Sequence, residues 1–150
     1  MMKFCSVVFA ASLVIAPAVR AAPLQVSTDR RVIIPAHWRP SGGYMDVALR
    51  CAAWFIEHPD VTNPNLLKQI GLVRQHATEY RLQFIGTFRE GHTVLLCNFF
   101  PAQLPGQKED PFPYWKARRV EANGGGFRFW RLEFDNSIGR CTNFSVNGNG

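Results

Sequence analysis

The sequence has few of the patterns that identify a catalytic or metal-binding protein. Its four histidines show no HxH or HExxH spacing and its cysteines no Cys-x-x-Cys spacing, so no single element carries the ligands of a metal site. The glycine triplet at 124–126 precedes the strand-like FRFWRLEF, whereas a dinucleotide-binding turn must open a helix. We expect no cofactor and no metal, unless distant parts of the chain assemble a metal site.

Candidate acid–base pairs are also scarce. Adjacent side chains such as those of Glu109 and Asp110 point apart, so they give no argument for a glycosidase-like pair. Glu133 and Asp135 share a predicted strand face with Arg131, which favours a surface ion pair. No catalytic residue is therefore assigned, and the sequence favours a protein without enzymatic activity.

No apolar run after residue 21 is long enough to cross a membrane. Residues 1–21 combine an early positive charge at Lys3, an apolar run over 4–18 and small residues before Ala22, which predicts a signal peptide cleaved after Ala21. The run has about 15 residues, whereas a spanning helix needs roughly 20. We expect an exported protein, periplasmic or secreted, with no membrane span after cleavage.

The positive charge is not gathered in a basic block. The chain has 17 basic and 11 acidic side chains, and without Lys3 and Arg20 its net charge falls from +6 to +4. Its arginines are scattered, whereas nucleic-acid binding favours a continuous basic stripe. We expect a solvated surface and no nucleic-acid partner.

Two predicted strands, Tyr80–Arg89 and Thr93–Phe100, organise the chain. The first alternates apolar and polar residues, which is typical of a half-buried strand. The second is apolar on both faces and is expected to be a central strand covered on both sides. Glu90-Gly91 between them predicts a hairpin turn.

Two helices are predicted before this hairpin. Tyr44–His58 is apolar over most of its circumference and is expected to lie across the sheet. Asn63-Pro64 opens a short surface helix. Eight side chains are expected to be buried between helix and sheet: Trp54, Phe55, Leu82, Phe84, Leu96, Trp130, Leu132 and Phe134.

The other segments are expected to complete the sheet. Residues 22–43 read as an extended, flexible arm that adds an edge strand, with Trp38 folded against the body. Pro101–Pro113 has the composition of a long loop, and long loops often carry function. Further strands are expected at Tyr114–Glu121, Phe127–Asp135 and Thr142–Val146.

Three cysteines follow the predicted cleavage site, and an oxidising compartment favours a disulfide. We expect Cys51, on the apolar arc of the first helix, to pair with Cys97, on an apolar strand face. Cys141 shares a predicted strand face with the polar Asn143 and Ser145, so it is expected to point away from the helix. A cysteine nucleophile is disfavoured because apolar surroundings raise the pKa of a thiol.

The end of the chain resembles the closing hairpin of a group of small exported bacterial proteins of uncharacterised function. The resemblance is carried by Phe134-Asp135, Gly139, Phe144-Ser145 and Asn147-Gly148, which are mostly turn residues. It implies export, and it implies no site.

Together these patterns predict an α+β fold, with two N-terminal helices packed on a curled antiparallel sheet of four to five strands and residues 44–150 forming a single domain. Cystatin-like and NTF2-like folds share this order, and such folds host both enzymes and binding proteins. We expect an exported binding or accessory module whose partner is another envelope or extracellular protein. The alternatives are a small enzyme with a pocket between sheet and helix, and a structural subunit of an envelope complex, which would expose an unprotected edge strand.

Overall fold

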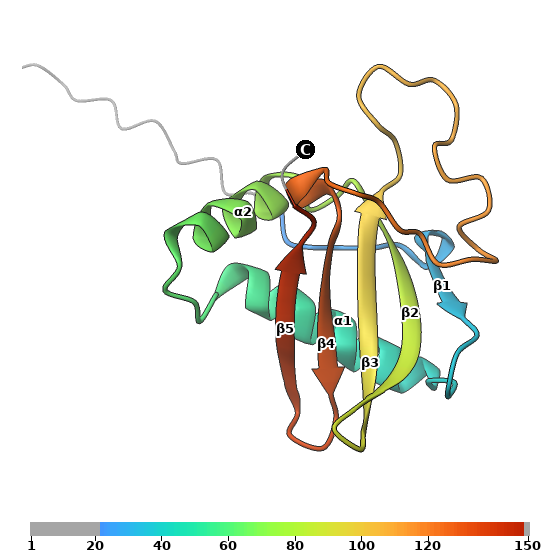
Figure 1. The fold of residues 1–150 in the computed structure, drawn as a ribbon, viewed down its shortest axis with the longest axis vertical. Helices are drawn as coiled ribbons and strands as arrows, with labels where there is room; N and C mark the ends of the chain where they lie inside the picture. Colours follow the sequence, from blue (N-terminus) through green and yellow to red (C-terminus); the bar gives the residue numbers. More distant parts are fainter. Residues whose placement is uncertain (1–21, 149–150) are drawn as a thin grey trace, which may run out of the picture.

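The computed structural model describes residues 22–148, which form an α+β fold of two helices and one open five-stranded sheet (Figure 1). The strands lie in the order β1-β2-β3-β4-β5, and α1 crosses one face of the sheet. The predicted α+β class is confirmed, and the predicted signal peptide at 1–21 lies outside the described residues. The helices and strands are β1 Arg31–Ile34, α1 Gly42–Glu57, α2 Pro64–Gln75, β2 Tyr80–Arg89, β3 His92–Pro101, β4 Trp130–Asp135 and β5 Arg140–Val146.

The sheet is mixed, whereas the sequence predicted an antiparallel one. β1 pairs with β2 in parallel, and the other neighbouring strands are antiparallel. The reason is that both helices lie between β1 and β2 in the chain, and such a crossover connection brings the second strand back in the direction of the first. Residues 22–43 supply this edge strand, and their Leu24 and Val26 are buried in the core.

α1 buries a narrower face than predicted. The Ser41 hydroxyl accepts a hydrogen bond from a backbone N–H of the first turn at 3.3 Å, which caps the helix. Ala48, Ala52 and Ile56 recur every four residues and are fully buried against the sheet. Trp54 follows Ala52 by two residues, about 200° around the helix, and is 62% exposed. The predicted burial of Trp54 is therefore wrong.

α2 is a short helix on the side of the molecule. The Asn63 side chain accepts hydrogen bonds from the backbone N–H groups of Asn65 and Leu66 at 2.9 and 3.1 Å, as the sequence predicted for a capping asparagine. Ile70 and Val73 attach the helix to the core. Among residues 22–148, no helix is both long and apolar enough to cross a membrane.

The predicted hairpin is confirmed. β2 and β3 pair along their whole length, and Glu90 and Gly91 make the turn with φ angles of 49° and 83°. Trp38 packs against β2 where Gly86 leaves room for it, since a Cβ atom at Gly86 would collide with Trp38. Its indole N–H donates to the carbonyl oxygen of Thr87 at 2.9 Å, so Trp38 is folded against the body as expected.

The core lies between α1 and the sheet and is built from aromatic rings. Phe99 and Trp130 stack with ring centroids 3.7 Å apart, and Tyr80 meets both rings edge-on. Of the eight predicted core residues, Trp54 is exposed and Phe55 is partly buried. Five others are buried in this core as predicted: Leu82, Phe84, Trp130, Leu132 and Phe134. Leu96 is also buried, but on the other face of the sheet, where it packs with Ile34 and Ile85.

Within the segment 102–125, residues 112–120 pack on the outer face of the sheet, which is the face turned away from α1. The strand predicted at Tyr114–Glu121 is wrong, because this stretch forms turns and irregular backbone. The buried amide of Gln83 donates to the carbonyl oxygens of Trp115 and Arg118 at 2.6 and 2.7 Å. Such side-chain bonds occupy backbone groups that a strand would use for pairing.

Candidate functional site

A groove of about 620 Å³ opens between the C-terminal half of α1, the connection to α2 and the edge strand β5. Figure 1 shows these three elements together at the β5 side of the sheet. The lining is mostly apolar, and it comprises Cys51, Trp54, Phe55, His58, Asp60, Val61, Leu66 and the unbroken run of residues 139–144.

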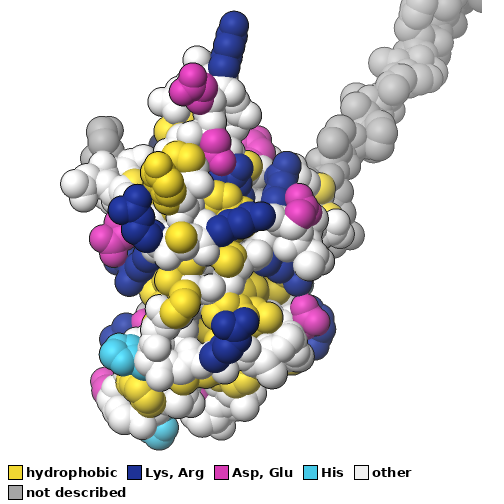
Figure 2. Space-filling model, turned by 90° about the vertical axis from the view of Figure 1, so that its right-hand side faces the viewer, with side chains coloured by type: hydrophobic (Ala, Val, Ile, Leu, Met, Phe, Trp, Pro, Cys, Tyr) yellow, Lys and Arg dark blue, Asp and Glu magenta, His cyan; other side chains and the backbone are white. Residues whose placement is uncertain are grey.

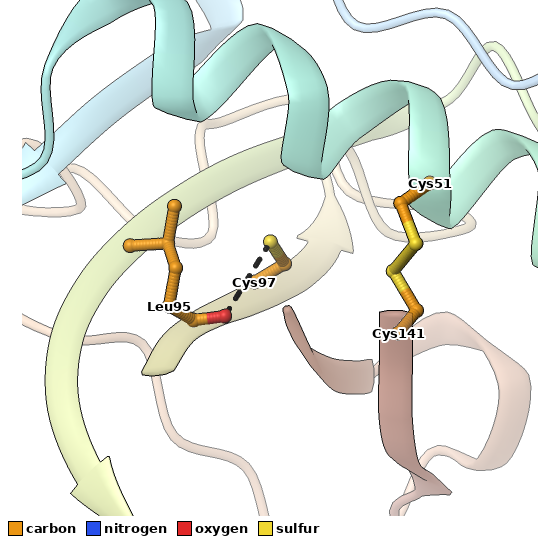
Figure 3. The surroundings of a disulfide bond; sticks show 4 residues. All are labelled: Cys51, Leu95, Cys97 and Cys141. Carbon is orange, nitrogen blue, oxygen red and sulfur yellow. Dashed lines mark hydrogen bonds between the residues drawn. A yellow bond between two sulfur atoms is a disulfide. The ribbon is translucent and has the colours of Figure 1, made fainter. Parts of the chain in front are cut away.

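A disulfide at this groove joins α1 to β5. It links Cys51 and Cys141, whose Cα atoms lie 6.0 Å apart (Figure 3). The predicted pairing of Cys51 with Cys97 is therefore wrong. The two partners are 90 residues apart in the chain, so the bond fixes the last strand to the first helix.

The disulfide partner was predicted wrongly because β5 contains a β-bulge. The β4–β5 register shifts at the bulge, and Asn143 there has a φ angle of 52°, in the left-handed region. The extra residue inverts the alternation, so Cys141 before the bulge and Phe144 after it both pack against the core under α1. A strict period of two across residues 141–146 would instead point Cys141 away.

Within residues 22–148, Cys97 is the remaining thiol, and it is completely buried on β3. Its sulfur lies 3.9 Å from the carbonyl oxygen of Leu95 and points away from the bridge in Figure 3. Burial raises the pKa of the Cys97 thiol, which keeps it protonated and unreactive.

We predict that iodoacetamide adds to no cysteine of the folded chain that starts at Ala22, because Cys97 is buried and the other two cysteines are bonded. After unfolding without reductant it should add to one thiol, and peptide mapping should place it at Cys97. Intact mass before and after labelling measures both numbers. Labelling of the folded protein, or of Cys141 after unfolding, would contradict the assignment.

Trp54 is the prominent feature of the groove. Its indole is exposed and stacks on the imidazole of His58, with ring centroids 4.9 Å apart and planes at 24°. The His58 Nδ1 lies 3.2 Å from the carbonyl oxygen of Trp54, which holds the imidazole beside the indole. The stack thus presents a large and oriented apolar surface at the groove.

The opposite wall is a sheet edge. β5 pairs with β4 on one side and has no strand on the other, and no hydrogen bond from elsewhere in residues 22–148 reaches the backbone of Arg140–Val146 along that free side. Residues 139–144, which line the groove, include the first part of this edge. Backbone donors and acceptors therefore lie next to apolar side chains.

The groove has the chemistry of a binding surface. Its titratable side chains are His58, Asp60 and Arg140, and its two cysteines are bonded to each other. Within residues 22–148, no group of three or more His, Cys, Asp or Glu side chains is placed to hold a metal ion. The arrangement suits apolar contact together with main-chain hydrogen bonding.

Two other histidines, His37 and His76, lie apart from this groove. His37 packs on Phe88 at the hairpin, with ring centroids 5.6 Å apart. His76 lies 2.8 Å from the carboxylate of Glu79. The space between α1 and the sheet, where a small enzyme would need its pocket, is filled by the aromatic core.

The side of the molecule that carries β1 and the segment 102–125 has a surface on which charged and hydrophobic side chains are mixed. Figure 2 shows this side, with hydrophobic side chains near the centre and Lys and Arg set apart from one another by hydrophobic and acidic groups. On the visible surface of the described residues, no continuous basic stripe runs across this side.

Sequence reasoning placed Trp54 in the core and therefore missed the groove. The available signal was the four-residue recurrence of Ala48, Ala52 and Ile56, which identifies the face of α1 closest to the sheet. Comparisons of the chain with protein-family models, with curated proteins and with solved structures found no match.

Proposed function

We propose that the protein is an exported binding or accessory module that takes up an extended segment of another envelope or extracellular protein. The segment adds to the free edge of β5 and places an apolar side chain against Trp54. One observation carries the proposal: the run of residues that lines the groove, 139–144, is also part of the unpaired sheet edge.

This arrangement provides both affinity and selectivity. An added strand forms main-chain hydrogen bonds with the edge, and pockets beside the edge select its side chains. The groove can take such a side chain between Trp54 and the aliphatic Val61 and Leu66. Exposed tryptophans contribute strongly at interfaces because a large rigid ring is desolvated on contact.

The bulge at Asn143 limits the length of the partner segment that can pair with β5. Open edges invite uncontrolled pairing between copies, and a bulge interrupts the regular row of backbone groups. The part of β5 before the bulge, Arg140–Thr142, stays regular and borders the groove. A short partner segment therefore fits the edge better than a long strand does.

Export rests on the sequence of residues 1–21 and on the resemblance of the final hairpin. The Cys51–Cys141 disulfide is in keeping with an oxidising compartment. A structural subunit of an envelope complex is the second candidate, because the same free edge of β5 would serve for permanent assembly.

We predict that Trp54→Ala weakens binding of short peptides by about 30-fold or more, the effect of a binding hot spot worth about 2 kcal/mol. The peptides are first selected from a random phage-displayed library on the purified chain starting at Ala22, and their dissociation constants are then measured by calorimetry. Melting temperatures should stay close to that of the wild type, because the indole is exposed.

Tyr114→Ala is the matched control. Tyr114 is 65% exposed and lies in the segment on the other face of the sheet, so its loss should change the dissociation constant by less than about twofold. Selected peptides that bind both variants equally well, or a library that yields no saturable binder, would overturn the proposed function.

A further inference from the structure

A second hollow, of about 520 Å³, lies on the outer face of the sheet, and it shares only Asn143 and Phe144 of β5 with the groove at Trp54. Three arginines from three separate elements line it: Arg89 at the end of β2, Arg119 in the segment 102–125 and Arg131 in β4. Its one acidic residue is Glu133. With the three guanidinium groups charged and this carboxylate ionised, the lining carries a net charge of +2.

Both carboxylate oxygens of Glu133 accept hydrogen bonds from other side chains of the protein. Two guanidinium nitrogens of Arg89 donate to its carboxylate oxygens, and the Asn143 side chain donates to Oε2 at 2.7 Å. The hydrogen bonds from Arg89 hold the pKa of the Glu133 carboxyl below its usual range. The carboxylate therefore orients Arg89, and the rest of that guanidinium is open to the hollow.

Arg119 is held in place by a buried amide network. The neighbouring Val120 donates its N–H to Gln83 Oε1 at 2.9 Å and accepts from Asn98 Nδ2 at 3.0 Å. On its other side, the carbonyl oxygen of Arg118 accepts from Gln83 Nε2 at 2.7 Å. Buried amide networks of this kind fix the backbone that they contact. These hydrogen bonds therefore fix the backbone on both sides of Arg119, whose side chain lines the hollow.

Two of the three arginines lack a buried acidic partner. Arg131 is exposed, and its Nε donates to the Ser145 hydroxyl at 3.2 Å. The carboxylate nearest to Arg119 is that of Glu121, at 3.4 Å and with its side chain 74% exposed. Water screens such a surface pair, so it offers little competition to a ligand.

We propose that this hollow binds the phosphate group of a phosphorylated ligand. A phosphate monoester carries close to two negative charges at neutral pH, which matches the net charge of the lining, and guanidinium forks fit its oxygens. The Ser145 hydroxyl supplies a further donor. The same chemistry is offered by a free phosphorylated metabolite and by a phospholipid headgroup.

The test uses the folded chain starting at Ala22 and two probes: glycerol 3-phosphate in calorimetry, and vesicles of phosphatidic acid in phosphatidylcholine in co-sedimentation. Arg119→Ala and Arg131→Ala should each weaken binding by about tenfold or more, since each removes charge-assisted hydrogen bonds. Arg50→Ala removes the same charge from α1, on the other face of the sheet, and should leave binding unchanged.

Binding of glycerol 3-phosphate identifies a free ligand as the source, and binding of the vesicles alone identifies a headgroup. Either result supports the site if it depends on Arg119 and Arg131. No saturable binding of either probe, or an equal loss in the Arg50 variant, would overturn the proposal. Because the peptide-binding experiment varies Trp54, which does not line this hollow, and the phosphate experiment varies arginines that do not line the groove, the two proposals can fail independently.

Discussion

Replacing Trp130 with alanine is expected to lower the free energy of unfolding by about 3–5 kcal/mol. The indole is 1% exposed and stacks on Phe99, with Tyr80 edge-on to it and Phe144 packed at 5.8 Å between ring centroids. The truncation leaves a cavity among rigid rings that cannot collapse to fill it. Urea unfolding followed by circular dichroism measures the change.

Trp54→Ala is the matched control, because it removes the same side chain from a site that is 62% exposed. Its effect on the free energy of unfolding should stay within about 0.5 kcal/mol. Equal losses in the two variants, or an unchanged midpoint for the Trp130 variant, would show that the strand faces are assigned wrongly.

Removing the disulfide is expected to cost about 4–5 kcal/mol. The bond joins cysteines 90 residues apart in the chain. In the chain-entropy model, closing a loop of this length lowers the conformational entropy of the unfolded chain, which stabilises the folded state by about 4–5 kcal/mol. Cys51→Ala, Cys141→Ala and the double variant should lose nearly the same stability, because each removes the same bond. Urea unfolding without reductant measures all three.

Cys97→Ala serves as the control for this series. It leaves the bond intact and removes only a small buried thiol, so reductant should still destabilise this variant by the same amount as the wild type. If the Cys51 and Cys141 variants differed widely in stability, or if Cys97→Ala abolished the effect of reductant, the pairing of Cys51 with Cys141 would be wrong.

Local patterns were sufficient to predict much of the fold. The alternation in Tyr80–Arg89 and the turn at Glu90-Gly91 predicted the hairpin, and Asn63-Pro64 predicted where the second helix begins. These features depend on residues close in the chain. The strand over Trp130–Asp135 was also predicted with the correct inward face, although it begins three residues later than expected.

The features that escaped prediction depend on contacts between distant residues. A single extra residue at Asn143 changes which way Cys141 points, and no local pattern marks the bulge. The segment at Tyr114–Glu121 was expected to be a strand, but Gln83, more than thirty residues earlier, bonds to its backbone. The exposure of Trp54 follows from which face of α1 meets the sheet, and that choice is made by tertiary packing.

The candidate site combines both kinds of feature. The sequence predicted that the protein would be a binding module, and it predicted the helix and the strand that border the groove. It did not predict that β5 would be a free edge next to an exposed tryptophan, because the order of the strands arises from tertiary pairing. The proposed partner therefore rests on the structure.

The most direct test of strand addition is amide hydrogen exchange of residues 139–144 in the presence of a peptide selected on the wild type. Strand addition predicts that the outward-facing amides of this run exchange markedly more slowly when the peptide is bound, because they gain main-chain hydrogen bonds at the free edge of β5. Bound peptide that leaves these amides unchanged and slows exchange elsewhere, for example along β1, would contradict it.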